Sequence, residues 1–316
     1  MSPSLTQSPA PPAPAKAKNP SNRSANLAFW MFVSPALIGL TIFTLIPIVW
    51  GLILSFSQAQ NTVRPVKFVG FANYLDLLTD PAFLLALRVI VIFAAFIVPL
   101  TYCASLGLAL LINKAGKGSA FFRTVFFIPS AVSYVIASLI WKISLFSGTE
   151  SGFANQVVGT FGHGPLEWIT TTAPPWYWLV LVTARLWLQV GFYMIIFLAA
   201  LQEIPPSIYE AASVDGAKPG WQTLRFITLP QLRATTISVL ILNFIAAFQA
   251  FDEFYNILAG AGGAYLAARP PLIYLYSIAL ADQDFGRGTA GAFIVTALIL
   301  AVTAVQSRIL GFGDRD

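Results

Sequence analysis

The chain has 316 residues, of which 57% are hydrophobic and 10% are charged, and its formal net charge is +5 at pH 7. Soluble domains are about 45–50% apolar, and a soluble fold of this length needs far more polar surface. The composition therefore excludes a soluble globular protein and predicts an all-α integral membrane protein that crosses the bilayer several times.

The chain begins with a segment, residues 1–25, that is rich in Pro, Ala and Ser and has no hydrophobic pattern. Such a composition predicts a disordered tail. The apolar run that follows, 29–56, is too long for the roughly 7–15 residues of a signal-peptide core. We therefore predict a retained membrane span and place the membrane domain at residues 26–316.

Six apolar segments are long enough to cross a bilayer, which takes about 20 mostly apolar residues. They lie at 29–56, 84–112, 122–145, 176–202, 233–257 and 288–310. The apolar piece at 270–281 is too short to cross and is expected to be an interfacial or re-entrant helix. We predict six transmembrane helices.

The loops differ in their content of Lys and Arg. If the N-terminus is cytoplasmic, eleven basic residues of the tails and loops lie inside and four lie outside. This bias predicts that both termini are cytoplasmic. It also explains the pI of about 9.4. The chain has no basic patch with interleaved aromatic residues, so we expect no nucleic-acid partner.

The residue inventory argues against catalysis. His163 and Cys103 are the single His and the single Cys. A His/Cys metal cluster, a Cys–His pair and a disulfide within the chain are therefore excluded. The phosphate-loop pattern G-x-x-x-x-G-K-[ST] is absent as well, so the chain does not bind ATP by that route. The glycines of 259–264 follow a span and are expected to form an outer turn.

One mixed, charged stretch, "YEAASVDGAKPGWQTLRFITLP" at 209–230, lies between the fourth and fifth spans. Ser207 and Glu210 have the spacing of a capping box, which predicts a short helix. Gly216 is expected to end it with a positive φ, and a second short helix should close before Pro230. The pattern suits two helices that dock into a cleft on another protein, and equally a solvated loop on the lipid headgroups.

Polar residues within the spans are candidates for a solute path. Gln249, Asp252, Glu253 and Asn256 have i, i+3, i+4 and i+7 spacing, which predicts one helical face near the outer end of the fifth span. On a continuous helix the acids would lie at its negative end, so a compensating partner or a polyol ligand is expected. Alternatively, the four residues mark the water interface. Arg185 is expected to pair with a carboxylate or a neighbouring subunit, or else to touch the solute.

The mixed stretch resembles the EAA loop of permease subunits from binding-protein-dependent ABC importers, whose pattern is E-A-A-x-x-D-G-A followed by I-x-L-P. The residues in register are Glu210, Ala211, Ala212, Asp215, Gly216, Ala217, Ile227, Leu229 and Pro230. The segments "FVGFANYLDLLTDPAF", "RTVFFIPSAVSYVIASLIWK", "WLQVGFYMIIFLAALQEIP" and "FQAFDEFYNI" are similar to the sugar-type, MalF-like branch. The resemblance covers about residues 29–310.

The resemblance implies a type I ABC importer permease fold, in which the loop 203–232 is the coupling helix docked on a cytoplasmic ATPase. The implied coupling residues are Glu210, Ala211, Ala212, Asp215, Gly216 and Pro230. It further implies a bacterial or archaeal inner membrane, and four kinds of partner: a second permease, an ATPase dimer that binds the ATP and Mg, an extracytoplasmic solute-binding protein and membrane lipid. The chain itself then needs no cofactor and is not an enzyme.

The implied solute is a sugar or sugar-like molecule, and another polar solute such as a glycerol phosphate or polyol is the alternative. Besides Arg185 and the four stripe residues, aromatic side chains are candidates for contact with a sugar face, although helix packing also explains them: Trp187, Tyr193, Phe248 and Phe251. A secondary transporter would need internal repeats, which the sequence lacks. A membrane-embedded enzyme would need an acid, base or metal set.

Overall fold

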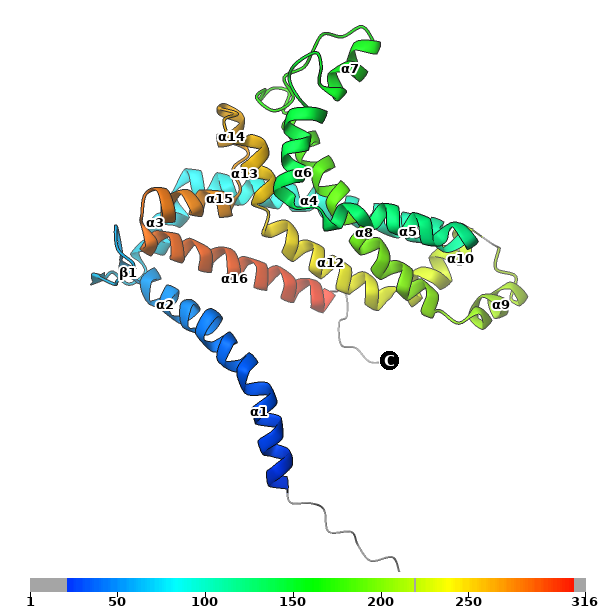
Figure 1. The fold of residues 1–316 in the computed structure, drawn as a ribbon, viewed down its shortest axis with the longest axis horizontal. Helices are drawn as coiled ribbons and strands as arrows, with labels where there is room; N and C mark the ends of the chain where they lie inside the picture. The colour runs from blue at the N-terminus through cyan, green and yellow to red at the C-terminus, as the bar shows by residue number, and fades with distance from the viewer. Residues whose placement is uncertain (1–21, 219, 310–316) are drawn as a thin grey trace, which may run out of the picture. The chain divides into compact units, whose positions relative to one another are not determined.

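The computed structural model describes residues 22–218 and 220–309, and the chain divides into two compact units, 1–51 and 52–316. The chain is mostly helical (Figure 1). The elements of the first half are α1 (Asn22–Leu40), η1 (Thr41–Leu45), α2 (Ile46–Ser55), β1 (Ser57–Gln58), β2 (Lys67–Phe68), α3 (Ala72–Thr79), α4 (Pro81–Lys114), η2 (Gly116–Gly118), α5 (Ser119–Phe127), η3 (Ile128–Ala131), α6 (Tyr134–Ile140), η4 (Trp141–Leu145) and α7 (Phe153–Thr160). Those of the second half are α8 (Tyr177–Glu203), α9 (Pro206–Val214), α10 (Trp221–Thr223), η5 (Leu224–Thr228), α11 (Leu229–Gln231), α12 (Arg233–Phe248), α13 (Asp252–Leu258), α14 (Gly263–Ala267), α15 (Pro271–Tyr276), η6 (Ser277–Ala281) and α16 (Phe285–Ile309).

The first apolar segment is helical, and residues 26–55 are long and apolar enough to cross a membrane. Pro47 lacks an N–H and its ring crowds the carbonyl four residues earlier. The one-turn π-helix η1 precedes this proline, and Ile46 N–H donates to Thr41 O instead. Most of the predicted tail, 1–21, lies outside the described residues. The helix α1 begins at Asn22 and so includes the last four residues of that segment.

Within the described residues, four helices are apolar and long enough to be candidate spans, and six segments are if two bent pairs each count as one. The pair 119–131 and 134–145 is bent by 96°, and the pair 221–231 and 233–248 by 73°. The predicted span over 122–145 is therefore not one continuous helix. The physical reason is local, because Pro129 cannot donate a helical hydrogen bond and Ser133 caps the new helix by accepting from Val135 N–H.

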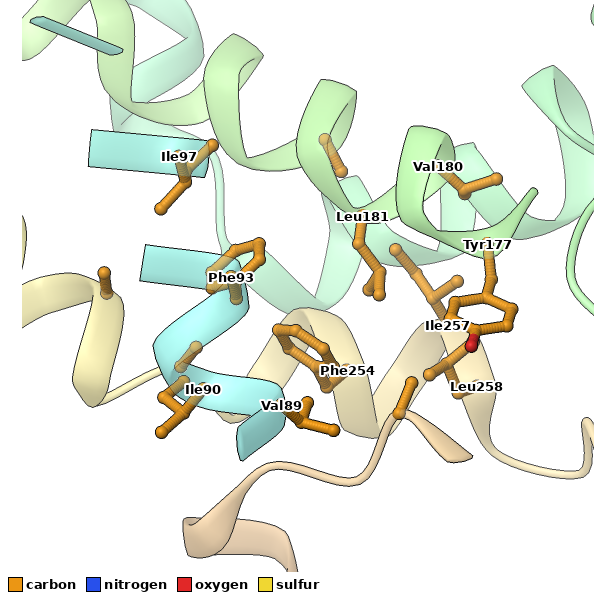
Figure 2. Packing of buried hydrophobic residues seen from close by; sticks show 14 of the residues in the cluster. Val89, Ile90, Phe93, Ile97, Tyr177, Val180, Leu181, Phe254, Ile257 and Leu258 are labelled. Atoms are coloured by element: carbon orange, nitrogen blue, oxygen red, sulfur yellow. The ribbon is translucent and has the colours of Figure 1, made fainter. Parts of the chain in front are cut away.

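The predicted fifth helix, 233–257, is also interrupted. It consists of α12 and α13, with three non-helical residues between them. The apolar side chains of the short helix α13 pack against α4 and α8, as Figure 2 shows. The Phe93 and Phe254 rings meet edge to face there, with their centroids 4.9 Å apart. The side chains labelled in this core are Val89, Ile90, Phe93, Ile97, Tyr177, Val180, Leu181, Phe254, Ile257 and Leu258.

The apolar piece at 270–281 forms a helix, as predicted, from Pro271 to Ala281, and it packs against α16. Glycines on α16 permit the close approach. A Cβ at Gly288 would lie 2.6 Å from the Ala279 Cβ, and one at Gly291 would overlap a Leu275 methyl. A short hairpin of β1 and β2 pairs Ser57 with Phe68.

Asp80 joins three of these helices. It caps α4 by accepting from Ala82 N–H at 2.8 Å, accepts from the Tyr274 hydroxyl, and lies 3.5 Å from Arg287 Nη2. Partial burial raises the pKa of this carboxyl, but the hydrogen bonds from Tyr274, Ala82 and Phe83 and the charge of Arg287 outweigh it, so the pKa lies below its usual value.

Candidate functional site

The first half of the loop 203–232 is the helix α9, which ends in a Schellman motif. Gly216 has φ +87°, as the sequence predicts. Gly216 N–H donates to Ser213 O at 3.2 Å, and Ala217 N–H donates to Ala212 O at 2.9 Å. These bonds satisfy carbonyls at the end of α9 and fix the turn. The predicted cap by Ser207 is wrong: among the described residues no side chain caps α9, whose first turn begins with prolines instead.

The second half of the loop is helical from Trp221 to Gln231, so the expectation that it closes before Pro230 is wrong. The π-turn η5 explains the difference. Leu229 N–H donates to Leu224 O, five residues back, and this wider turn accommodates a proline that has no N–H of its own.

The loop presents a polar and apolar surface together. Of the predicted coupling residues, Ala212 is half-buried, and the exposed ones are Glu210, Ala211, Asp215, Gly216 and Pro230. Three large apolar side chains beside them are exposed: Val214 by 86%, Trp221 by 69% and Phe226 by 67%. Because a loop in water seldom exposes three large apolar side chains, this surface is typical of an interface.

A groove of about 620 Å³ lies between the loop and the ends of α4 and α8. Its lining comprises Leu110, Asn113, Lys114, Leu201, Tyr209, Ser213, Ala217, Gly220, Trp221, Thr223, Leu224 and Thr228. Only part of the surface of the loop therefore packs against α4 and α8.

The second polar region is buried and centred on Arg185 of α8. Its Nη1 donates to Glu253 Oε1 at 2.7 Å, its Nη2 donates to Ala246 O, and its guanidinium lies 5.2 Å from the centre of the Tyr134 ring. The two charged side chains are 5% and 1% exposed. The carboxylate partner expected for Arg185 is thus Glu253.

The break between α12 and α13 alters the predicted polar stripe. Gln249 and Asp252 are exposed, Asn256 is half-buried, and Glu253 points inward to Arg185. The expectation of one continuous helical face is therefore wrong. So is the expected dipole penalty, since Asp252 and Glu253 lie in the first turn of α13, the positive end of a helix dipole.

A cavity of about 190 Å³ opens beside the ion pair. It is lined by Tyr134, Arg185, Gln189, Ala246, Gln249, Phe251, Asp252 and Glu253. Tyr134 and Gln189 also line a second cavity, of about 270 Å³, which contains Tyr193. The structure thus gathers six of the predicted residues around two adjoining cavities. Asn256 is not among their lining, and its Nδ2 donates to Asp252 O within α13.

Tyr134 and Gln189, which line both cavities, were not predicted from the sequence. Gln189 carries a readable signal, because it lies one helical turn after Arg185 in an apolar span. Tyr134 carries none, since its place depends on the bend before α6. No group of three or more His, Cys, Asp or Glu side chains suited to a metal occurs among the described residues.

On the loop between α6 and α8, the helix α7 projects beyond α6 (Figure 1). Asn155, buried on α7, orders this loop: its amide donates to three carbonyls and accepts from Leu166 N–H and the Trp168 indole N–H. The opposite face exposes Phe153 by 60%, Val157 by 45% and Phe161 by 76%. An ordered loop thus carries an apolar stripe at i, i+4 and i+8.

Comparisons with known proteins agree with this architecture. Residues 103–310 match the model of the family described as "Binding-protein-dependent transport system inner membrane component". The chain is 33% identical to the lactose transport system permease protein LacF of Rhizobium radiobacter, over 88% of this chain and 92% of LacF. It is 32% identical to the sn-glycerol-3-phosphate transport system permease protein UgpA of Agrobacterium fabrum, over 89% and 94% of the two chains.

Among solved structures, a chain of a bacterial alginate ABC transporter in complex with an alginate pentasaccharide-bound periplasmic protein has a TM-score of 0.80. Its sequence identity to this chain is 23%, and the match covers 91% of this chain and 95% of that one. The fold is therefore that of an ABC transporter permease. The chain belongs to the family of inner membrane components of binding-protein-dependent transport systems.

Proposed function

We propose that this chain is the membrane-spanning subunit of an ATP-driven importer for a sugar or sugar-like solute, with six spans and both termini in the cytoplasm. A separate ATPase dimer supplies the energy, a second permease subunit completes the path, and an extracytoplasmic protein delivers the solute. The observation that carries the proposal is the ordered loop 203–232. This loop connects α8 to α12, the helices beside the polar cavities, and it exposes the apolar side chains of Val214, Trp221 and Phe226.

The connection of this loop explains how force would reach the path. α8 ends at Glu203 directly before the loop, and α12 begins at Arg233 directly after it. α8 carries Arg185 and Tyr193, whereas α12 leads to Gln249 and α13. A partner that moves the loop therefore pulls on both sides of the cavity, which suits rigid-body alternating access.

The charge of the cavity favours an uncharged solute over a glycerol phosphate. The charge of Arg185 is compensated by Glu253 at 2.7 Å, and Asp252 adds an exposed negative charge to the same lining. A phosphate ester there would face a net negative surface with no uncompensated cation among the lining residues. A neutral sugar instead finds hydrogen-bonding groups on Gln249 and Asp252 and an aromatic face on Phe251, which suits polyhydroxylated molecules.

The experiment is reconstitution of the complete importer in proteoliposomes, with the solute-binding protein outside and ATP inside. We expect ATP-dependent accumulation of a neutral saccharide that the binding protein accepts, and little accumulation of sn-glycerol 3-phosphate. Uptake that needs no ATPase subunit, or that follows an ion gradient, would overturn the proposal in favour of a secondary transporter. Preferred, ATP-dependent uptake of the phosphate ester would instead show that the proposed solute class is wrong and that the ATP-driven import is right.

The apolar stripe of α7 is proposed as a contact for the solute-binding protein. The loop 146–175 carries Glu150 and Glu167 but no Lys or Arg, which disfavours adsorption to an anionic lipid surface. Replacing Phe153 and Phe161 by Ser removes apolar contact while Asn155 still orders the loop. We expect a higher concentration of binding protein for half-maximal stimulation of ATP hydrolysis, with an unchanged maximal rate. An unchanged concentration dependence would exclude α7 from this contact.

A further inference from the structure

Arg185 bridges the two sides of a broken helix. Its Nη2 donates to Ala246 O, in the last turn of α12, and its Nη1 donates to Glu253 Oε1, in the first turn of α13. A cation thus lies at the negative end of one helix and its carboxylate at the positive end of the next. We call this set of contacts, formed by Arg185, Ala246 O and Glu253, the clasp.

The backbone alone gives α12 and α13 a weak connection. Ala250 N–H donates to Ala247 O rather than to Ala246 O, and Phe251 has φ −140° and ψ −60°, outside the helical region. The carbonyl that this break releases is the one that Arg185 binds. The clasp therefore links α12 to α13 where the helical hydrogen bond between Ala250 N–H and Ala246 O is missing.

Energetics argue that the clasp does more than stabilise the fold. Both side chains are at most 5% exposed, and Arg185 Nε and Glu253 Oε2 are buried without hydrogen-bond partners among the described residues. A buried ion pair is often no more stabilising than apolar side chains of similar volume, because desolvation opposes the attraction. Apolar packing already holds α13 in place, since Phe254, Ile257 and Leu258 pack on α4 and α8 (Figure 2).

We infer that Arg185 and Glu253 are positioning residues that make α13 move together with α8 and α12. The inference rests on the proposed function. α8 and α12 flank the loop 203–232, and α13 carries Asp252 into the cavity. With the clasp intact, a displacement of the loop moves all three helices as one body. Without it, α12 moves relative to α8 and to α13, which remains packed on α8, so ATP hydrolysis continues but moves less solute.

The test compares solute moved per ATP hydrolysed in the reconstituted importer. The main variant is Arg185→Met/Glu253→Leu, which removes both charges together and leaves no unpaired buried ion. We expect assembly and ATP hydrolysis stimulated by the binding protein to persist, while solute moved per ATP falls by about tenfold, within the usual range of coupling between sites. Arg287→Lys is the matched control, because its ion pair with Asp80 lies outside the clasp.

Arg185→Lys provides a second variant if the double variant does not assemble. Lys keeps the charge, but one ammonium group lacks the planar fork that binds Ala246 O and Glu253 together. We expect a lower transport-to-ATP ratio here as well. A wild-type ratio in either variant, or an equal loss in Arg287→Lys, overturns the clasp. A wild-type importer without ATP-dependent uptake would instead refute the proposed function, so the two failures are distinct.

Discussion

Substitution of Gly216 tests whether the turn of the loop 203–232 couples the permease to the ATPase subunit. Gly216 has φ +87°, and a Cβ added there would meet no atom within 4 Å. Gly216→Ala therefore costs only the left-handed backbone conformation, about 1–2 kcal/mol. Gly216→Pro is more severe, because proline fixes φ at about −65° and lacks the N–H that donates to Ser213 O in the wild type. The lost hydrogen bond adds roughly 0.5–1.5 kcal/mol.

The readout is the amount of ATPase subunit that stays bound when the importer is purified in detergent. If the full conformational cost of Gly216→Ala falls on docking, the affinity drops by roughly 5- to 30-fold, because each 1.4 kcal/mol is about tenfold. Gly216→Pro should still insert, since the apolar spans are unchanged, but it should lose the ATPase or hydrolyse ATP without uptake.

Gly260 is the matched control for this prediction. It has φ +83° and open space around its Cβ position, so Gly260→Ala has a similar local cost, but it lies between α13 and α14. We expect Gly260→Ala to keep the ATPase at the wild-type level. If Gly216→Pro keeps its ATPase and transports at the wild-type rate, the loop is not the coupling element.

Three further predictions concern topology, the cavity and pH. In a Cys103→Ser background, a cysteine in 150–170 should react with an impermeant thiol reagent from outside and one in 114–120 should not; the reverse labelling would invert the proposed orientation. Asp252→Asn should slow uptake without loss of assembly, because the side chain is exposed and lines the cavity; unchanged kinetics would make it a marker of the water interface. The lowered pKa of Asp80 stabilises the fold above its ordinary value of 3.8, and this contribution is lost as pH falls through the lower folded-state value. Asp80→Asn should therefore flatten the loss of thermal stability below about pH 4, and an acid profile identical to that of the wild type would contradict this expectation.

Features that depend on local chemistry could be predicted from the sequence. The end of α9 follows from Gly216, since only glycine readily adopts the φ that a Schellman motif requires. The long apolar runs of α4, α8 and α16 likewise predict helices, because burial in a bilayer leaves no other partner for the backbone. The bend before α6 had a local signal in Pro129 and Ser133, but the continuous apolar run concealed it.

The break between α12 and α13 could not be predicted in this way. The residues around it, "IAAFQAFDEF", contain no Gly or Pro and favour a continuous helix. The broken form is stabilised by Arg185, which lies more than 60 residues earlier and binds both sides of the break. Since this contact is long-range, the burial of Glu253 and the exposure of Asp252 became apparent only in three dimensions.

A photo-crosslinker at Val214 tests whether the loop 203–232 transmits the energy of a partner ATPase. Val214 is 86% exposed at the end of α9, so a replacement there leaves the packing of the loop intact. In the assembled, transport-competent importer, we expect a crosslink to the ATPase subunit whose yield changes when ATP is added. Crosslinks confined to lipid or to this chain itself, in an importer that still accumulates solute with ATP, would contradict it.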